Sequence, residues 1–394
     1  MEDRTSIPSS VLDFHVSFCH SHSRLRPEKI AMKKKLRVAL LFGGKSAEHE
    51  ISLVSARNIA KAIDKNKYQL VAIGIDRQGR WHLDEGARLL YDEKRRTVKL
   101  TERKSLAAVR PGANPTPLLR EGGGGIGAID VVFPVLHGPF GEDGTIQGLL
   151  KLADLPFVGA GVLGSAVGMD KDVMKRLLRD AKIAIPKFVV FEQREQKSIQ
   201  FTNIKKILGL PFFVKPANLG SSIGISKVSR PLQFRAAVDA AFRYDSKIII
   251  EEAIRGREIE CSVLGNDKPI ASLPGEIIVQ HEFYSYDAKY LDDRGARLEI
   301  PARLPKNIIT EIQRLAVRTF QVLCCEGMAR VDFFLRPNGE LLVNEINTIP
   351  GFTEISMYPK MWEVSGLSYS RLIDRLIGLA LQRWRQERRL RTSQ

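Results

Sequence analysis

Short apolar runs alternate with amphipathic segments along most of the chain from Leu36 onward. Strands are predicted in the runs LRVALLF, YQLVAIGID and AIDVVFPVLHG, and the short run LPFVG predicts another. The first run ends at a Gly43-Gly44 turn, after which a helix is expected to begin near Ser46, and GTIQGLLKLA predicts a second helix. Strands that alternate with helices in this way predict a parallel, Rossmann-like sheet.

The same kind of pattern predicts the remaining elements. The chain is expected to enter a helix near Ser165 that includes MDKDVMKRLLRDA, and PFFVKPANLGSSIGISKV predicts two strands joined by a glycine-rich loop. Further helices are expected at Pro231–Tyr244, near Asn307–Cys325 and close to the C-terminus, with strands in SKIIIEEAI and EIECSVLG. The segment that begins HEFYSYDAKY shows no clear periodicity for roughly 20 residues, and loops of that length are usually functional or disordered.

One predicted hairpin, ARVDFFLRPNGELLVNEINTIPG, places polar residues inside otherwise apolar strands. If Asn338-Gly339 forms a two-residue turn, pairing outward from it brings Asp332 opposite Glu345. Side chains on a strand alternate between the two faces. The four polar side chains that share one face are Arg330, Asp332, Glu345 and Asn347.

The facing carboxylates in this hairpin require compensation. Directly opposed Cβ atoms lie roughly 4.5–5.5 Å apart, so the two charges repel each other. A hard cation held by oxygen ligands relieves this repulsion. An exposed edge hairpin with solvated charges is the alternative, but Asn347 in the same row and the Thr348–Gly351 run after it favour the cation site.

The composition is typical of a globular protein of two or three domains, with 394 residues, 44% hydrophobic and 27% charged. The four cysteines show no zinc spacing, and the adjacent Cys324 and Cys325 predict reduced core residues and a cytoplasmic protein. No apolar run reaches the 18 residues that would indicate a membrane span. The net charge of +16 is concentrated in segments such as QRWRQERRLR without a recognition-helix signature, which argues against a nucleic-acid partner.

Several further groups are candidates for chemistry on an anionic substrate. Lys215 ends a strand, and the Gly220–Gly224 loop after it can offer N–H groups to anionic oxygens, although an ordinary hairpin turn remains the alternative. Lys171 in MDKD is a second candidate phosphate ligand, against the alternative of a surface lysine. Carboxylates at the end of an apolar strand and just beyond it could meet a nucleoside: Glu251, Glu252 and Glu258.

Two candidates lie in the first part of the chain. Glu48 is predicted just inside a helix, where the helix dipole stabilises a carboxylate, although it is equally typical of an ordinary first turn. His137 follows a strand at the edge where open parallel sheets bind ligands, against the alternative of a packed or capping histidine. Lysines, a glycine-rich loop and a row of oxygen ligands together suit phosphoryl transfer, which needs cations on the phosphate oxygens.

These motifs, taken in order, resemble the D-alanine–D-alanine ligases of bacterial cell-wall synthesis, which are ATP-grasp enzymes. The resemblance runs from Met32 to the final helix, and residues 1–31 and the arginine-rich tail fall outside it. Since MKKKLRVALLFGG reads like a protein start, residues 1–31 are expected to be a disordered extension or to precede the true start. The matching motifs are LLFGGKSAEHEIS, LHGPFGEDGTIQGLL, MDKDVMKRLL, VKPANLGSSIGISKV, YSYDAKYL, ARVDFF and NEINTIPGFTEISMYP.

The resemblance implies an α/β fold in which an N-terminal Rossmann-like domain precedes a two-subdomain ATP-grasp fold. It implies that ATP phosphorylates the carboxylate of one D-alanine, and that the amine of a second D-alanine attacks the acyl phosphate. A homodimer is also implied, and K⁺ activation is left open. The boundaries expected are 32–160 for the N-terminal domain, 161–254 and 255–382 for the two subdomains, and 383–394 for a basic tail.

The resemblance also implies roles for individual residues. Asp332, Glu345 and Asn347 would hold two Mg²⁺ or Mn²⁺ ions, with Glu345 between them. The nucleotide would meet Lys171, Lys215 and the Ser221-Ser222 loop at its phosphates, and Glu251, Glu252 and Glu258 around its adenine and ribose. The D-alanine substrates and the oxyanion would meet Glu48, Ser356 with the Met357 backbone, Arg330 and the Gly351 N–H.

Glu48, Ser221 and Tyr290 match a hydrogen-bonded triad of the family, and Tyr290 favours an amine acceptor over D-lactate. The second hypothesis is an ATP-grasp ligase that uses D-lactate or D-serine as acceptor. A nucleotide-binding regulator without catalysis is the third, and the complete set of metal-ligand candidates argues against it.

Overall fold

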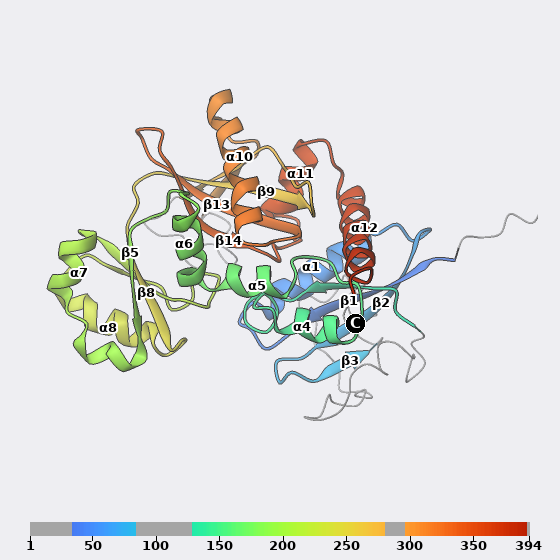
Figure 1. The fold of residues 1–394 in the computed structure, drawn as a ribbon, viewed down its shortest axis with the longest axis horizontal. Helices are drawn as coiled ribbons and strands as arrows, with labels where there is room; N and C mark the ends of the chain where they lie inside the picture. Colours follow the sequence, from blue (N-terminus) through green and yellow to red (C-terminus); the bar gives the residue numbers. More distant parts are fainter. Residues whose placement is uncertain (1–33, 84–127, 280–295, 392–394) are drawn as a thin grey trace, which may run out of the picture. The chain divides into compact units, whose positions relative to one another are not determined.

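Three β-sheets organise the residues that the computed structural model describes, which are 34–83, 128–279 and 296–391 (Figure 1). In the first sheet the central strand is parallel to both neighbours, and an antiparallel strand is added at one edge. This confirms the predicted parallel sheet, whereas LPFVG forms only a single bridge, Val132 to Phe157, instead of the predicted strand. The strands, in spatial order, are β3 (Trp81–Leu83), β2 (Tyr68–Ile75), β1 (Leu36–Gly43) and β4 (Val131–Val135).

The edge strand β3, which the sequence did not predict, is joined to β2 by a turn organised around Asp76. The Asp76 carboxylate accepts the N–H groups of Gln78 (2.9 Å) and Arg80 (2.8 Å) and the Arg80 Nε–H (2.7 Å). Nε2 of His82, on β3 itself, lies 3.0 Å from the same carboxylate. Burial alone would raise the pKa of Asp76, but the hydrogen bonds from His82 and Arg80 outweigh it and lower that pKa to about 2.

Helices cover both faces of this sheet, and one of them comes from the far end of the sequence. α1 (His49–Ala62) and α12 (Tyr369–Glu387) share one apolar core with the sheet, and α4 (Thr145–Leu152) packs on a second core (Figure 1). α12 continues through residues that were assigned to a basic tail, and Arg383 within it is buried. Its guanidinium donates to the carbonyls of Phe157 (2.9 Å) and Gly159 (2.7 Å), so this arginine fastens the last helix to the first sheet.

The second sheet is antiparallel and carries the glycine-rich loop. Its core brings together the rings of Phe201, Phe212 and Phe234, which lie 5.7–6.0 Å apart. The predicted strand–loop–strand unit and the helix after it are confirmed. The elements are β5 (Phe188–Glu192), β8 (Lys247–Glu252), β6 (Phe212–Pro216) and β7 (Ser226–Val228) in spatial order, with η1 (Gln193–Ser198), α7 (Phe201–Leu208) and α8 (Pro231–Ala241).

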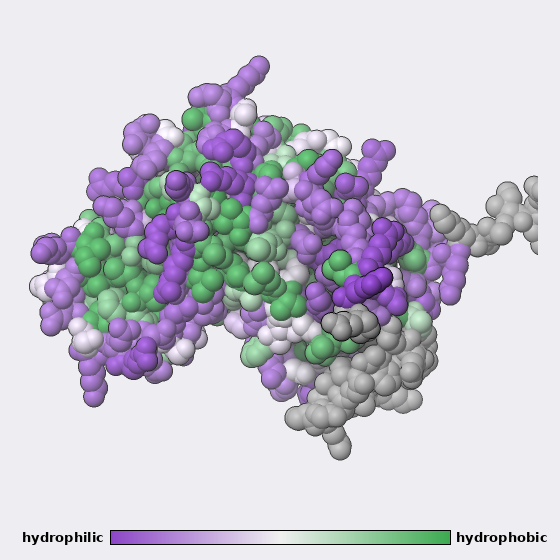
Figure 2. All heavy atoms as spheres, in the orientation of Figure 1, coloured by the Kyte–Doolittle hydropathy of each residue, from purple (hydrophilic) through white to green (hydrophobic). Residues whose placement is uncertain are grey.

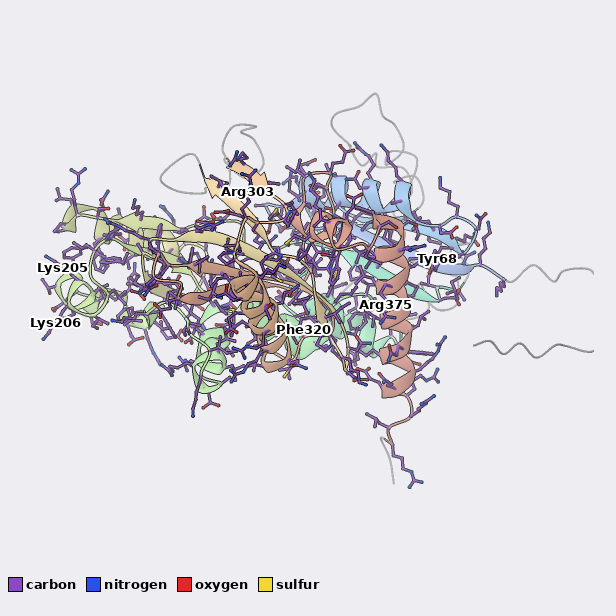
Figure 3. The ribbon with its side chains drawn as sticks, turned by 90° about the horizontal axis from the view of Figure 1, so that it is seen from above. Tyr68, Lys205, Lys206, Arg303, Phe320 and Arg375 are labelled. Atoms are coloured by element: carbon purple, nitrogen blue, oxygen red, sulfur yellow. The ribbon has the colours of Figure 1, made fainter. Side chains whose placement is uncertain are left out.

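The third sheet is also antiparallel. α10 (Lys306–Val322) packs on it through Phe320, which is fully buried and labelled in Figure 3. The strand β12 lies within the segment predicted as a long loop, of which residues 281–295 lie outside the described residues. The strands, in order, are β12 (Ala296–Glu299), β11 (Gly275–Val279), β9 (Arg257–Gly265), β13 (Gly327–Leu335) and β14 (Leu341–Asn347), with β10 (Ile270–Ala271) paired to β9.

The predicted hairpin is formed by β13 and β14, but its turn is longer than predicted. The Arg336 N–H donates to the Glu340 carbonyl (2.9 Å), so three residues form the turn instead of two. Further along β14, Asn344 is an extra, bulged residue that shifts the pairing back by one position. The two departures cancel, and Asp332 therefore pairs with Glu345 as predicted.

The single helix predicted around MDKD is in fact two helices. α5 (Val162–Met169) ends at Asp170, whose side chain caps α6 (Lys171–Asp180) by accepting the N–H groups of Asp172 and Val173. Aspartate is a preferred N-cap because its oxygen satisfies the free N–H groups of the first turn. One further short helix, α11 (Met357–Val364), follows the hairpin.

Hydrophilic residues cover much of the surface seen in Figure 2, including the face of α12. Within the described ranges, every helix is too short or too polar to cross a lipid bilayer.

We expect Asp76→Asn to lower the free energy of unfolding at pH 7 by about 2 kcal/mol. The folded-state pKa is about 2, below its ordinary value of 3.8, so this stabilisation is present above pH 4 and is lost as the pH falls towards 2. Urea unfolding from pH 2.5 to 7 measures the effect, and Asp180→Asn, at an exposed position on α6, is the control. Equal pH dependence in the variant and in the unmodified protein would contradict the assignment.

Candidate active site

A polar cavity lies where residues from all three sheets converge. Glu48 and His137 reach it from the first sheet, Ser221 from the glycine-rich loop, and Arg330 from the third sheet. Most of the lining residues lie in loops or at the ends of helices and strands. Binding residues are often found there, because loops present them on a rigid scaffold. The other predicted site residues that line it are Lys171, Glu345, Asn347, Gly351, Ser356 and Met357.

Three neighbouring strands place carboxylates in one row. On β13, Asp332 pairs with Glu345 of β14 on one side and with Glu260 of β9 on the other. Glu260 is buried and was not predicted, although it follows Glu258 by two positions and therefore lies on the same face of β9. Three like charges at adjacent positions would repel each other strongly if nothing compensated them.

Arg330 supplies part of that compensation. Its Nε and NH2 groups donate to the two oxygens of Asp332, both at 2.7 Å, and Nε also lies 3.0 Å from a Glu260 oxygen. Burial would lower the pKa of Arg330, but the charges of Asp332 and Glu260 raise it well above the ordinary value, so the guanidinium is always charged.

Lys171 provides a second cation at the start of α6. Its Nζ lies 3.5 Å from a Glu345 oxygen and donates to the Leu219 carbonyl (2.8 Å) in the glycine-rich loop. Two residues after Glu345 on β14, the Asn347 Oδ1 accepts the Ile349 N–H (3.1 Å). Lys171 thus contacts both the glycine-rich loop and Glu345 in the row of carboxylates.

A second, smaller recess adjoins the cavity. Asp332 and Glu258 open onto this recess, and Glu345 and Glu260 line both spaces. Both of these carboxylates therefore border the cavity and the recess. Within the described ranges there is no ready-made cluster of three His, Cys, Asp or Glu residues that would hold a metal by itself.

Glu48 connects the first sheet to the glycine-rich loop. It immediately precedes α1 instead of lying just inside it as predicted, and it is buried. The Ser221 hydroxyl donates to the Glu48 carboxylate. Ser221 and Ser222 both have positive φ angles (53° and 59°), which non-glycine residues adopt only at a cost of about 1 kcal/mol or more each. Such strain is characteristic of functional loops.

His137 and Glu142 are two further residues that line the cavity. The His137 Nδ1–H donates to the Ile349 carbonyl (3.0 Å), and burial lowers the pKa of this imidazole, so it is neutral with Nε2 as an acceptor. Burial and then the charge of Glu48 raise the pKa of Glu142 well above its ordinary value, and its carboxyl accepts the Gly138 N–H (2.8 Å). Glu142 lies in the motif LHGPFGEDGTIQGLL, but no role was predicted for it from the sequence. Its spacing of four residues from Gly138 could have indicated that its side chain turns back to the Gly138 N–H.

A helix start and a glycine also line the cavity. Ser356 is the N-cap residue of α11, and its hydroxyl accepts the Thr353 N–H (2.9 Å). A Cβ on Gly351 would lie 2.8 Å from the Ser356 Oγ, so a larger residue at this position would force Ser356 to shift. The free N–H groups at the start of a helix favour an anionic group.

The remaining predicted nucleotide ligands lie outside both spaces. Lys215 is turned towards Glu251, with which it forms an ion pair, and the buried Lys175 is the second partner of that carboxylate. Glu252 accepts the Lys187 N–H (2.8 Å) and pairs with Arg336 (3.4 Å). Ser222 lines neither space, and Tyr290 lies outside the described residues.

Comparison with known proteins identifies the family. Models described as "D-ala D-ala ligase N-terminus" and "D-ala D-ala ligase C-terminus" match residues 37–160 and 177–378. The D-alanine–D-alanine ligase of Oceanobacillus iheyensis is 50% identical over 364 residues, which cover 92% of this chain and 99% of that protein.

Solved structures agree with this result. The D-alanine–D-alanine ligase of Coxiella burnetii superposes with a TM-score of 0.75 at 40% identity, over 91% of this chain and 97% of that one. A D-Ala:D-Ser ligase from Enterococcus faecalis superposes with the same TM-score at 38% identity, over 88% and 100%. The predicted α/β fold class and the predicted resemblance are both confirmed. This chain belongs to the D-alanine–D-alanine ligase family.

Proposed function

We infer that this protein uses ATP to join two D-alanine molecules into D-alanyl-D-alanine, through a D-alanyl phosphate, for peptidoglycan precursor synthesis. The observation that supports this most strongly is the single cavity in which Glu48, Ser221, Arg330 and Glu345 meet. Membership of the family and 50% identity to a D-alanine–D-alanine ligase support the same activity.

We propose that Asp332, Glu345 and Asn347 hold two Mg²⁺ ions, and that Mn²⁺ can replace them. The donors fit because all three present oxygen atoms, and Glu345 lines both spaces, with Asn347 in the cavity and Asp332 in the recess. Magnesium in phosphoryl-transfer enzymes is usually bound by one or two carboxylates together with substrate phosphates, so a complete protein cage is not needed. When bound, the ions would neutralise charge on the phosphate oxygens.

The nucleotide would lie between the second and third sheets. Lys171 and Lys215 would contact its phosphates, and the Ser221-Ser222 loop would cover them with its N–H groups. Support for Lys171 comes from its position between that loop and Glu345. The carboxylates assigned to the adenine and ribose surroundings are Glu251, Glu252 and Glu258.

The amino-acid substrates would occupy the cavity itself. Glu48, held by Ser221, would bind the ammonium group of the first D-alanine, and neutral His137 would offer it a second acceptor. Ser356 and the N–H of Met357 would bind the carboxylate of the second D-alanine at the start of α11.

Arg330 and the Gly351 N–H would donate to the oxyanion that develops when the amine attacks. Fixed donors of this kind are worth a few kcal/mol because they need no reorganisation during the reaction. Glu260 keeps the guanidinium in place independently of Asp332. Tyr290 would complete the link from Glu48 and Ser221, and closure over the site would keep water from the acyl phosphate.

Because a D-Ala:D-Ser ligase is among the similar structures, D-serine is the alternative acceptor. The higher identity to a D-alanine–D-alanine ligase favours D-alanine. A homodimer and a cytoplasmic location are proposed from the family alone, and sedimentation of the purified protein tests the first of them.

We expect phosphate release from ATP with D-alanine and not with L-alanine, and mass spectrometry should show D-alanyl-D-alanine. Acceptor competition with D-serine and D-lactate tests the choice of acceptor. A depsipeptide or a D-alanyl-D-serine as main product would overturn the assignment, and ATP binding without any turnover would favour a regulator.

We expect Glu345→Gln to reduce kcat by about a hundredfold or more, since a bridging charge for both ions is removed and such ions contribute several kcal/mol. The substitution is isosteric, so the melting temperature should change little. Phosphate release over a Mg²⁺ titration measures the loss. The control is Glu340→Gln in the exposed turn of the same hairpin, and unchanged activity of Glu345→Gln would refute the metal assignment.

A further inference from the structure

We propose that Lys175 is a positioning residue that keeps Lys215 available to the phosphates of ATP. The proposal rests on the ATP-dependent reaction inferred above and adds a residue to it. Lys175 lies on α6, four residues after Lys171, so both side chains leave the same side of the helix.

The three groups form a compact ion cluster with one negative and two positive charges. The Lys175 Nζ lies 2.5 Å from one oxygen of Glu251, and Lys215 pairs with the other oxygen. The exposed fraction of the side chain is 1% for Lys175, 3% for Glu251 and 12% for Lys215. Lys215 is therefore the most accessible of the three groups, and Lys175 lies inside the protein.

A second contact holds Lys175 in place when Lys215 moves. Its Nζ also donates to the main-chain carbonyl of Asn344 (3.2 Å). Asn344 is the bulged residue of β14 directly before Glu345. Lys175 thus joins Glu251 of the second sheet to the strand that carries a proposed metal ligand, and it cannot follow Lys215 towards a phosphate.

The charge count explains why a second lysine is needed. If Lys215 turns from Glu251 towards a phosphate, Glu251 still has Lys175 as its counter-ion. Without Lys175, the same movement would leave a carboxylate that is almost fully buried and has lost both ammonium partners, which is costly in a region of low dielectric constant. Glu251 would then hold Lys215 and compete with the nucleotide for it.

A purely structural lysine would behave differently. It would contribute packing and a hydrogen bond, and its loss would weaken the binding of adenosine and of ADP alike. The electrostatic role affects only ligands that carry phosphates. The ratio of the two dissociation constants therefore separates the two roles.

The test compares the full-length protein with Lys175→Met by calorimetric titration of ADP and of adenosine at one fixed Mg²⁺ concentration. We expect the preference for ADP over adenosine to fall about tenfold, the loss of one charge-assisted contact. Lys205→Met, at an exposed position on α7 (Figure 3), is the matched control and should keep the full preference. An unchanged preference in Lys175→Met overturns the proposal.

Two further variants separate charge from packing. Lys175→Met combined with Glu251→Gln should recover most of the ADP preference, because Lys215 is no longer held by a buried carboxylate. A double variant as weak as the single one shows a packing effect and overturns the proposal. Lys175→Gln keeps a donor for the Asn344 carbonyl and replaces the methionine variant if that variant does not fold. We expect it to lose the preference for ADP over adenosine to the same extent. A full preference for ADP in Lys175→Gln would contradict the charge argument.

The outcome for the unmodified protein separates this inference from the proposed function. If the protein binds ADP no more tightly than adenosine, the phosphate role of Lys215 is wrong and the proposal falls with it. If the protein shows the preference and Lys175→Met keeps it, the ligase assignment stands and only the role of Lys175 is lost.

Discussion

The site depends on the repulsion between carboxylates that the third sheet forces into one row. Glu260, Asp332 and Glu345 are neighbours because the strands pair in that register, and their main-chain positions cannot separate without breaking the sheet. Arg330 and Lys171 offset part of this charge from within the protein. The remaining negative charge suits divalent ions.

Other acids near the site are also compensated by a neighbouring positive group or hydrogen-bond donor. Several acids near the site have a cation or an N–H donor as partner: Arg330 for Asp332, two lysines for Glu251, and the Gly138 N–H for Glu142. Because a buried charge without a partner is strongly unfavourable, these pairs also fix the orientation of each group. Orientation and neutralisation are thus achieved by the same contacts.

Much of the fold could be predicted because apolar periodicity reports local burial directly. β1, β2, β4, β6 and β8 all lie where their apolar runs predicted them. The break at Asp170 was missed because a capping aspartate inside an amphipathic run looks like an ordinary polar position. The bulge at Asn344 was missed because nothing in the strand sequence marks which residue is left unpaired, and Asp332 met Glu345 only because the longer turn compensated for it.

For the site, the sequence indicated the residue types but not their partners. Glu260 and Lys175 occupy positions that alternation along a strand and the helical repeat could have singled out, yet their roles depend on contacts between distant segments. Family motifs supplied roles for Lys215 and Glu251, but not the fact that the two are paired with each other.

The packing of α12 on the first sheet has a consequence for how the polypeptide can be divided. The apolar face of that sheet is completed by residues some 300 positions later, including Leu372, Ile373 and Leu376. A fragment that stops at residue 160 would leave this face open to water, and synthesis from the N-terminus must finish before it can be closed. The first sheet is consequently synthesised early, while the face that α12 covers is completed last.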